Sequence, residues 1–209
     1  MVFKNREEAG RLLAESLLSY KNAPKTIVIG LPRGGVVVAA AAAQSLGLPL
    51  DVVVPRKIGA PGNPELAIGA LAGDLVLLNQ PLIKELGAAP DYIEKAAAEE
   101  KREAARRRAL YRKGLPPQNF RGLTLLVIDD GVATGSTFKA SIAYLRNALP
   151  QKIIAAFPVG APDAVEELKT AADEVVCLYT PASFLAVGQF YEHFPQTSDE
   201  EVIYLLTRS

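Results

Sequence analysis

The chain has 209 residues, of which 49% are hydrophobic and 22% are charged, an ordinary balance for a globular domain with a sizeable core. Lys and Arg together number 23, as do Asp and Glu, so overall charge does not draw this protein to nucleic acid or to an anionic membrane. The longest uninterrupted apolar run, residues 36–43, is far shorter than the roughly 20 residues that a membrane span needs.

The N-terminal segment has the pattern of an amphipathic helix and not of a targeting signal. Its charges are mixed, and it lacks the apolar core of a signal peptide. Leucines at helical spacing predict a helix over residues 5–20. The single cysteine, Cys177, lies in an apolar run that predicts a buried strand. It cannot form an intramolecular disulfide, which fits a reducing cytosol, so we expect a cytoplasmic protein.

Along the rest of the chain, short β-branched runs alternate with helical patterns. The apolar runs are nearly continuous, which is typical of parallel strands that are covered on both faces. Strands are predicted at residues 26–29, 51–54, 124–128, 152–157 and 174–178. Helices are predicted at residues 5–20, 36–46, 136–147 and 163–171. This βαβ series predicts a single domain over residues 1–209, built on an open α/β sheet.

One insertion, at about residues 55–115, interrupts this alternation. It begins with "PRKIGAPGNP", whose three prolines and two glycines exclude a helix or a central strand. Two apolar runs then flank Ala72-Gly73-Asp74, which predicts a hairpin, and residues 91–113 predict one long charged helix. Long irregular excursions in compact domains are usually functional or disordered, so this insertion is a candidate functional segment.

The stretch "TLLVIDDGVATGST", residues 124–137, has the strongest functional signal. A buried strand ends in Asp129 and Asp130, at the kind of position where ligands bind in open α/β sheets. The turn after the two acids consists mostly of small and hydroxyl residues. Its second half is Ala133, Thr134, Gly135, Ser136 and Thr137. Backbone amides, hydroxyls and a helix N-terminus that converge on one point form a phosphate cradle.

Two better-known phosphate motifs do not fit this turn. No lysine precedes the hydroxyl residues, so the turn is not a Walker A loop, and the Gly-x-Gly-x-x-Gly spacing of a dinucleotide site is missing. The acids indicate a different ligand, because carboxylates repel phosphate but accept hydrogen bonds from vicinal sugar hydroxyls. We therefore predict a site for a 5-phosphorylated ribose, with its 2- and 3-hydroxyls on Asp129 and Asp130. A capping acid pair on an ordinary turn is the alternative.

This stretch resembles the loop that binds 5-phosphoribosyl-1-pyrophosphate (PRPP) in type I phosphoribosyltransferases. Residues 125–137 match the family's four apolar residues, two acids, two small or apolar residues and Ala-Thr-Gly-x-Thr. Gly131 departs, since the family more often has an aliphatic residue there, and we expect weaker local packing. The resemblance implies a three-layer α/β/α fold with strand order 3-2-1-4-5-6. Residues 65–71 would supply an antiparallel third strand, and residues 180–209 a small hood.

The resemblance extends to two further loops. The segment "GLPRGG", residues 30–35, is similar to the family's pyrophosphate-binding loop, in which Arg33 would offer a forked donor and Gly34 and Gly35 bare amides. The segment "RKIGAPGNP" is similar to the flexible catalytic loop that closes over pyrophosphate, with Arg56 and Lys57 as its basic residues. Taken alone, the glycines would also suit close helix–sheet packing, and the two cations would also be solvated charges.

The chemistry that the resemblance implies is displacement of pyrophosphate from PRPP by a nitrogen nucleophile. Asp129, Asp130, Arg56 and Lys57 would be catalytic, acting through positioning and charge stabilisation. Mg²⁺ would be the cofactor, held by PRPP and water, with Asp129 and Asp130 as its candidate protein contacts and no dedicated metal cage. His193 is the single histidine, so a zinc site is not expected.

The acceptor is the least defined part of this prediction, a small nitrogen compound and most simply a nucleobase. The Arg-Gly-Gly of one loop resembles xanthine/guanine enzymes of purine salvage, whereas Ala133 stands where hypoxanthine/guanine members carry an acid and agrees with adenine-type members. Phe184 and Tyr191 are candidates for stacking on the base, although aromatic side chains of a C-terminal segment more often pack in the core. Many relatives are dimers, so a homodimer is possible in this case too.

A second hypothesis is a non-catalytic PRPP-binding regulator of nucleotide metabolism. Such a protein needs a partner surface, and "KREAARRRALYRK", residues 101–113, is a candidate basic patch. Intrahelical ion pairs with neighbouring glutamates account for this segment better, so nucleic-acid binding is not expected. A third hypothesis, a phosphosugar hydrolase or isomerase, would need an acid/base constellation that no second strand-end loop supplies.

Overall fold

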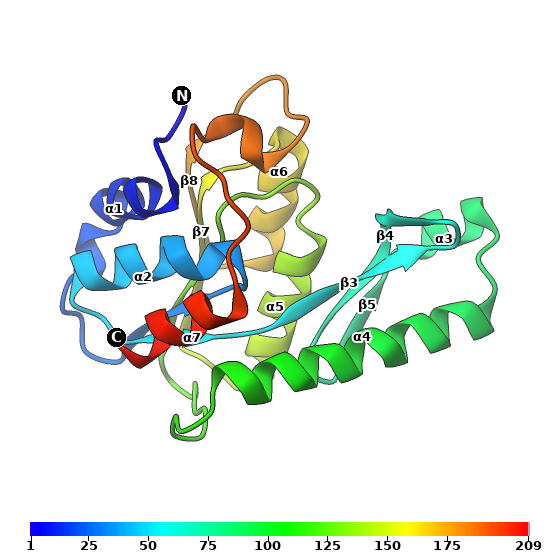
Figure 1. The fold of residues 1–209 in the computed structure, drawn as a ribbon, viewed down its shortest axis with the longest axis horizontal. Helices are drawn as coiled ribbons and strands as arrows, with labels where there is room; N and C mark the ends of the chain where they lie inside the picture. The colour runs from blue at the N-terminus through cyan, green and yellow to red at the C-terminus, as the bar shows by residue number, and fades with distance from the viewer. Residues whose placement is uncertain (209) are drawn as a thin grey trace.

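The computed structural model describes residues 1–208, and its body is built around a five-stranded parallel sheet (Figure 1). The strand order is β2-β1-β6-β7-β8. The strands are β1 Thr26–Gly30, β2 Leu50–Val52, β6 Thr124–Ile128, β7 Lys152–Val159 and β8 Glu174–Tyr179. Every pairing in this sheet is parallel. The α/β class expected from the continuous apolar runs is therefore confirmed, and the predicted strand ends shift by at most two residues.

Helices cover both faces of this sheet and produce three layers. The helices of the body are α1 Arg6–Ser16, α2 Gly34–Leu46, α5 Ser136–Arg146, α6 Pro162–Ala171 and α7 Asp199–Thr207. Helices α1 and α2 pack together over one face, in a core cluster that includes Val28 and Leu126. Helices α5 and α6 cover the other face, where Phe138 and Phe157 meet edge to face. Helix α7 lies against α2 and α4.

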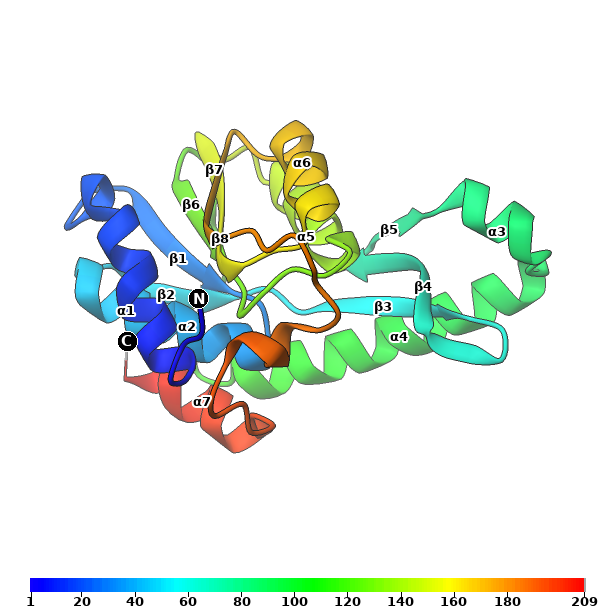
Figure 2. The same cartoon turned by 90° about the horizontal axis from the view of Figure 1, so that it is seen from above.

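The chain between β2 and β6 forms an arm that projects from the body (Figures 1 and 2). The arm contains a second, antiparallel sheet in the order β3-β4-β5, followed by two helices. Its elements are β3 Pro55–Ala60, β4 Asn63–Ala72, β5 Leu75–Leu78, α3 Gln80–Leu86 and α4 Pro90–Tyr111. The hairpin and the long charged helix predicted for this region correspond to β4–β5 and α4.

The strand order predicted for the parallel strands is confirmed, but the expected third strand does not join them. Residues 65–71 lie in β4, which pairs with β3 and β5 in the second sheet. The physical reason is that β4 is the central strand of the second sheet, so both of its edges are already paired. Side chains also lie at the outer edge of β2. Gln118 Nε2 donates to the Val52 carbonyl at 2.9 Å, and Arg112 donates to both carboxylate oxygens of Asp51 at 2.8 and 3.1 Å.

The segment expected to be a flexible loop forms a β-hairpin. Residues 55–60 form β3, an edge strand of the second sheet, and the chain turns at Gly62, which has φ +73°. The register with β4 shifts on either side of Gly59. An edge strand with a bulge tolerates prolines at its start and in its turn, because no ladder amide is required there. The prolines and glycines predicted that this segment would not be a central strand, and it is not one. They are compatible with the edge strand that it forms.

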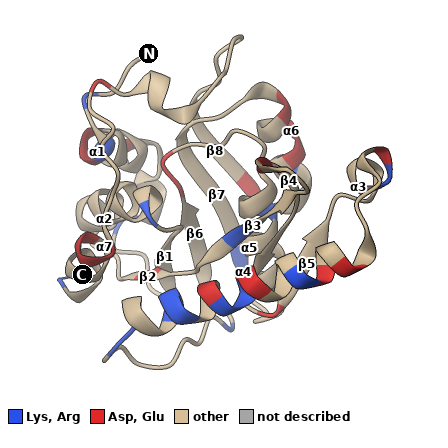
Figure 3. Ribbon diagram, turned by 45° about the vertical axis from the view of Figure 1, so that its right-hand side comes forward, with Lys and Arg blue, Asp and Glu red and all other residues tan. Residues whose placement is uncertain are grey.

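Helix α4 carries alternating charges along its length (Figure 3). Glu103 accepts hydrogen bonds from Arg106 at 2.7 Å and from Arg107 at 2.6 Å, as the ion-pair interpretation of this basic segment predicts. Lys101 pairs with Asp74 at 2.6 Å. Much of the positive charge of α4 is therefore compensated locally. No helix within residues 1–208 is long and apolar enough to cross a membrane.

The ion pair between Arg112 and Asp51 should be a major stabilising contact of the junction between arm and body. Each side chain is only 11% exposed, so Arg112→Met leaves a largely buried, unpaired carboxylate. We expect the free energy of unfolding in urea to fall by about 3 kcal/mol. The control Arg106→Met, at an exposed pair, should cost less than about 1 kcal/mol. Equal losses in the two variants would contradict this assignment.

Candidate active site

The two acids that follow β6 lie at the carboxyl edge of the parallel sheet. Asp130 N donates to Asp129 Oδ1 at 2.8 Å, so the backbone of one acid orients the side chain of the other. Strand β1 runs beside β6 with Gly30 opposite Ile128, and Leu31 N donates to the Ile128 carbonyl at 2.9 Å. The turn after β1 therefore leaves the sheet next to the acids, as the strand order predicts.

The turn after the acids is tied to β7 at one point and then opens into a helix. Val132 N donates to the Val159 carbonyl at 2.9 Å, and the Val132 carbonyl accepts from Ala161 N at 2.8 Å. Gly135, with φ +70°, precedes α5 and supplies no side-chain cap to the first amides of the helix. Those amides and the helix dipole can therefore receive an anion. The Thr134 and Ser136 hydroxyls lie 3.3 Å apart beside them.

Gly131, which departs from the family pattern, has a packing explanation. A Cβ atom at this position would lie 2.5 Å from Cγ1 of Val187. Val187 begins the short 3₁₀ helix η2 Val187–Phe190 of the C-terminal segment. The expectation of weaker packing at Gly131 was therefore wrong, because the Val187 side chain fills the space that an aliphatic residue at 131 would occupy.

Gly34 and Gly35 bring bare backbone directly against the acid pair. A Cβ atom on Gly34 would lie 2.1 Å from Asp130 Oδ2, and one on Gly35 would lie 2.5 Å from Asp129 Oδ1. No other residue type fits these two positions without displacing a carboxylate. Arg33 is oriented differently, since its guanidinium lies 3.8 Å from Asp199 Oδ1 at the start of α7. The structure thus brings the two glycines to the acids and directs Arg33 toward the C-terminal helix.

A cavity of about 840 Å³ gathers most of the predicted residues. Its lining includes Asp129, Asp130, much of the turn at residues 131–137, and Arg56 and Lys57 from β3 of the arm. The volume falls within the range of small-molecule sites. Each of the two cations is held by an acid that also lines the cavity. Arg56 Nε donates to Glu100 at 2.6 Å and Lys57 Nζ donates to Glu65 at 3.0 Å.

Arg6 is a site residue that the sequence analysis did not identify. Its Nε donates to Asp130 Oδ2 at 2.7 Å, and its side chain is only 9% exposed. It also donates to the Pro195 carbonyl at 2.7 Å and lies 3.7 Å from the centre of the Phe194 ring. The only available signal was its position, because a basic residue in the first turn of a helix opposes the helix dipole. Arg6 fixes one oxygen of Asp130 and connects α1 to the C-terminal segment.

Burial raises the pKa of both acids. For Asp129 the largest cause is burial, followed by the nearby charge of Asp130, and the pKa is raised well above its ordinary value. For Asp130 burial also raises the pKa, although the Arg6 guanidinium offsets part of this effect. An approaching cation or hydroxyl donor would favour the ionised form of either carboxyl group. Within residues 1–208, no group of three or more His, Cys, Asp or Glu side chains gathers for a metal ion.

The aromatic side chains proposed for base stacking lie in the core of the C-terminal segment. Tyr191 is 6% exposed, its ring packs between Phe3 and Phe194, and its hydroxyl donates to the Asp130 carbonyl at 2.6 Å. Phe184 packs on Phe190, with ring centres 5.3 Å apart. Neither residue lines the 840 Å³ cavity, where this segment contributes Leu185 and Val187 instead. Tyr191 therefore supports the backbone of Asp130, and apolar side chains form this wall of the cavity.

Comparisons with known proteins agree with this geometry. The phosphoribosyl transferase domain family matches residues 2–192. Two relatives from Mycobacterium tuberculosis strains, each named "Putative phosphoribosyl transferase", are 44% identical over 211 residues, which cover 100% of this chain and 47% of each relative. This chain thus spans about half the length of those curated relatives.

Two solved structures resemble the fold. The crystal structure of TT1426 from Thermus thermophilus has a TM-score of 0.82 and 41% identity, covering 100% of this chain and 99% of that chain. The structure of the AQ2163 protein from Aquifex aeolicus has a TM-score of 0.51 and 12% identity, covering 83% of this chain and 73% of that one. The second likeness concerns the fold alone.

The raised pKa of Asp129 has a testable consequence for stability. The ordinary pKa of this carboxyl group is 3.8. As pH rises above that value, the group loses its proton in the unfolded chain but still keeps it in the folded protein. The group therefore lowers the free energy of unfolding as pH rises from its ordinary pKa to its raised pKa. We expect Asp129→Asn to gain stability relative to the wild type as pH rises above about 4. Urea unfolding at several pH values measures this difference.

A control with the opposite sign is available. The pKa of Asp173 is lowered, chiefly by its hydrogen bond with Arg146, so this carboxylate adds stability above its ordinary pKa. Asp173→Asn should therefore lose stability relative to the wild type as pH rises toward about 4, below the range in which Asp129 acts, and should change little relative to the wild type at higher pH. If the two variants showed pH dependences of the same sign, the assignment of a destabilised buried carboxyl group to Asp129 would be wrong.

Proposed function

Because the chain belongs to the phosphoribosyl transferase domain family, we propose that it transfers the 5-phosphoribosyl group of PRPP to a nitrogen acceptor and releases pyrophosphate. The observation that carries this proposal is the gathering of the acid pair, the turn at residues 131–137 and the cations of β3 around one cavity. The backbone of Gly34 and Gly35 lies against the same acids. Phosphate, ribose and pyrophosphate thus each have a suitable set of groups within reach.

The proposed roles follow from the chemistry of each group. The uncapped amides of α5, with Thr134, Ser136 and Thr137, would bind the 5-phosphate. Asp129 and Asp130 would accept hydrogen bonds from the ribose 2- and 3-hydroxyls, which favours their ionised forms. Gly34 and Gly35 would donate their amides to pyrophosphate. Arg56 and Lys57 would exchange their present carboxylate partners for pyrophosphate oxygens.

In the reaction, the bond between the anomeric carbon and the pyrophosphate oxygen breaks, and its electron pair leaves with pyrophosphate. A bond from the acceptor nitrogen forms at the same carbon, and the proton that this nitrogen loses passes to water or to the departing pyrophosphate. Positive charge develops on the ribose ring, next to the carboxylates of Asp129 and Asp130, which would stabilise it. Arg56 and Lys57 would stabilise the negative charge on the leaving group. The protein would thus act through positioning and electrostatics.

Mg²⁺ is the cofactor in this proposal, and the available donors fit it. Asp129 and Asp130 provide carboxylate oxygens, which Mg²⁺ prefers, and their burial makes a nearby cation favourable. Two carboxylates leave room for water and substrate oxygens in the coordination shell. When bound, the ion would neutralise part of the charge on pyrophosphate.

The acceptor-binding wall is proposed to be apolar. Leu185 and Val187 line the cavity beside Gly131, and Leu185 is 87% exposed. An exposed leucine next to an otherwise polar cavity is suited to cover the face of a flat heterocycle. A nucleobase remains the simplest acceptor, and purine salvage is the corresponding pathway class.

The first experiment is release of pyrophosphate from PRPP with and without Mg²⁺, run against purines, pyrimidines, pyridine carboxylates and ammonia. We expect Mg²⁺-dependent release with one class of acceptor. PRPP binding measured by calorimetry accompanies this assay. Binding without release in any arm would support a PRPP-sensing regulator, and absence of PRPP binding would contradict both functions.

Asp130→Asn should weaken PRPP binding while leaving the protein folded. The variant keeps the shape of the side chain. It replaces one carboxylate oxygen, which would accept a hydrogen bond from the ribose, by an NH2 group that can only donate, and it removes the negative charge. We expect a loss in affinity of about ten- to a hundredfold. The control Glu85→Gln, on the exposed face of α3, should bind PRPP like the wild type. Unchanged affinity in a folded Asp130→Asn protein would remove Asp130 from the site.

Glu100→Gln should strengthen PRPP binding, because it frees Arg56 from a competing carboxylate. Both side chains of this pair are about one-third exposed, so the pair is worth at most about 1 kcal/mol, and the gain in affinity should not exceed about fivefold. Glu99→Gln, on the exposed side of α4, is the matched control and should have no effect. Weaker binding by Glu100→Gln would show that the pair positions Arg56 instead of competing with the ligand.

A further inference from the structure

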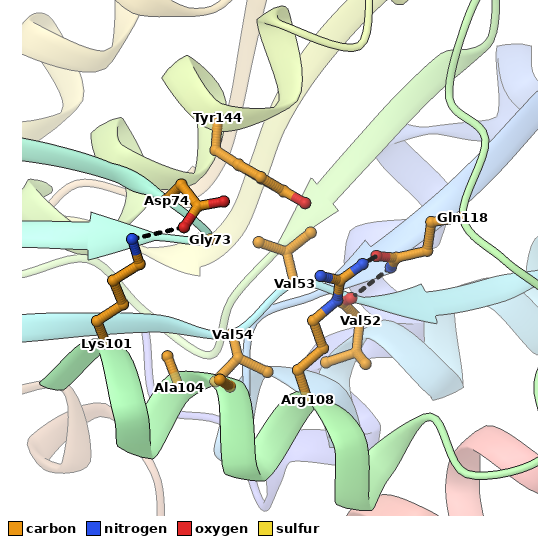
Figure 4. A pocket seen from close by; sticks show the side chains of 11 residues that line it. Val52, Val53, Val54, Gly73, Asp74, Lys101, Ala104, Arg108, Gln118 and Tyr144 are labelled. Atoms are coloured by element: carbon orange, nitrogen blue, oxygen red, sulfur yellow. Dashed lines mark hydrogen bonds and ion pairs between the residues drawn. The ribbon is translucent and has the colours of Figure 1, made fainter.

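A second cavity, of about 260 Å³, lies where the arm leaves the body (Figure 4). It is bounded by the end of β2, the middle of α4, the β4–β5 turn, Gln118 and Tyr144 of α5. It shares no lining residue with the 840 Å³ cavity. The chain passes from one cavity to the other between Val54 and Pro55. The two cavities are therefore separate, but they are lined by consecutive segments of the chain, Val52 to Val54 in one and the start of β3 with Arg56 in the other.

The cavity results from the way the main sheet ends. No strand pairs with the outer edge of β2 within residues 1–208, and the chain departs into the arm at Val53 and Val54. Gly73 then lets the β4–β5 turn approach α5 closely. A Cβ atom at Gly73 would lie 2.3 Å from Cε2 of Tyr144. The Tyr144 ring thus forms one wall, held against the turn.

The cavity has an apolar floor, and hydrogen-bond donors line one of its sides. Val53, Val54 and Ala104 are each about 5% exposed or less and form the floor. Arg108 donates to the neutral amide of Gln118 at 3.2 Å, and no carboxylate of residues 1–208 lies within ion-pair distance of it. The Tyr144 hydroxyl has no hydrogen-bond partner in the same part of the chain, and Figure 4 shows it directed toward the floor and the Arg108 side.

These features together select a class of ligand. The charge of Asp74 acts on Arg108 without direct contact, so the guanidinium keeps its hydrogen-bond donors available for a ligand. A guanidinium binds a carboxylate with paired hydrogen bonds, and a phenolic hydroxyl can donate to the same group. The apolar floor suits a ring. The volume lies below the range of drug-sized ligands, so it fits one ring and not a whole nucleotide. On the side of the cavity away from Gln118, the charges of Lys101 and Asp74 compensate each other, because the two side chains form an ion pair at 2.6 Å.

We propose that this cavity binds a small aromatic carboxylate and that its occupancy adjusts the active site through α4. Ala104 contributes to the floor one helical turn after Glu100, the residue that holds Arg56. A ligand wedged between α4 and the β4–β5 turn would fix the arm relative to the body, and with it Arg56 and Lys57. The binding itself is independent of the proposed transferase function, whereas the effect on the active site rests on it.

Benzoate is the probe for this site, because it has a ring and a carboxylate but no nitrogen that could act as an acceptor. Its binding to the full chain is measured by calorimetry and by NMR of the valine methyl groups. We expect saturable binding that shifts Val53 and Val54. Benzyl alcohol, which lacks the charge, and acetate, which lacks the ring, should each bind more weakly. No saturable binding of benzoate, or equal binding of acetate, would overturn the site.

Matched variants locate the binding. Arg108→Gln should weaken benzoate binding by about tenfold, and Tyr144→Phe by less. Arg102→Gln removes an exposed arginine of the same helix that does not line the cavity, so it should leave binding unchanged. All of these substitutions affect residues that are at least partly exposed, and urea unfolding verifies that each variant is folded. Undiminished binding by Arg108→Gln, or an equal loss in Arg102→Gln, would contradict the assignment.

The effect on the active site is tested by titrating PRPP with and without saturating benzoate. A change in PRPP affinity in the wild type that disappears in Arg108→Gln is the expected result. An unchanged PRPP affinity, with benzoate bound, would overturn the regulatory part of the proposal. A chain that binds benzoate but never PRPP would refute the proposed transferase function while leaving the benzoate site in place.

Discussion

Two adjacent carboxyl groups at the end of a buried strand impose the main constraint on this structure. Asp129 and Asp130 are both largely, but not fully, shielded from water, and burial raises the pKa of each. The surrounding structure responds in two ways. Gly34 and Gly35 leave out their side chains so that backbone can approach the carboxylates, and Arg6 supplies a single buried cation to one of them. The site is thus less stable than it could be, as expected where function requires buried charge.

The arm supplies Arg56 and Lys57, the cations of the 840 Å³ cavity, which the carboxyl edge of the main sheet does not provide. The body contributes acids, amides and hydroxyls to the 840 Å³ cavity, whereas Arg56 and Lys57 come from β3 in the second sheet. Both cations are already paired, Arg56 with Glu100 and Lys57 with Glu65, so a ligand of this cavity has to compete with these carboxylates for them. Anchors at the root of the arm, chiefly Arg112 on Asp51, determine where this opposing wall lies.

The parallel sheet and the turn after β6 could be predicted because their signals are local. Continuous apolar runs specify buried strands, and residues 124–137 combine a strand end, two acids and a helix start in one segment. The pairing of β4 could not be predicted, since it depends on β3 and β5 occupying both of its edges. Arg6 lies 124 residues from its partner Asp130, and no local pattern joins them. Helix α7 was missed although Ser198 and the acids after it form an N-cap signal.

The contacts around Asp130 also join the two ends of the chain. Arg6 reaches the Pro195 carbonyl, Phe3 N donates to the Phe190 carbonyl, and the Tyr191 hydroxyl holds the Asp130 backbone. The first two contacts close loops of more than half the chain, which form late because long loops are entropically costly to close. A chain emerging from the ribosome therefore has the turn at residues 131–137 long before it has the segment that fixes it. The candidate site is therefore a property of the completed fold, and it forms fully only when the last strand and the segment beyond it have docked.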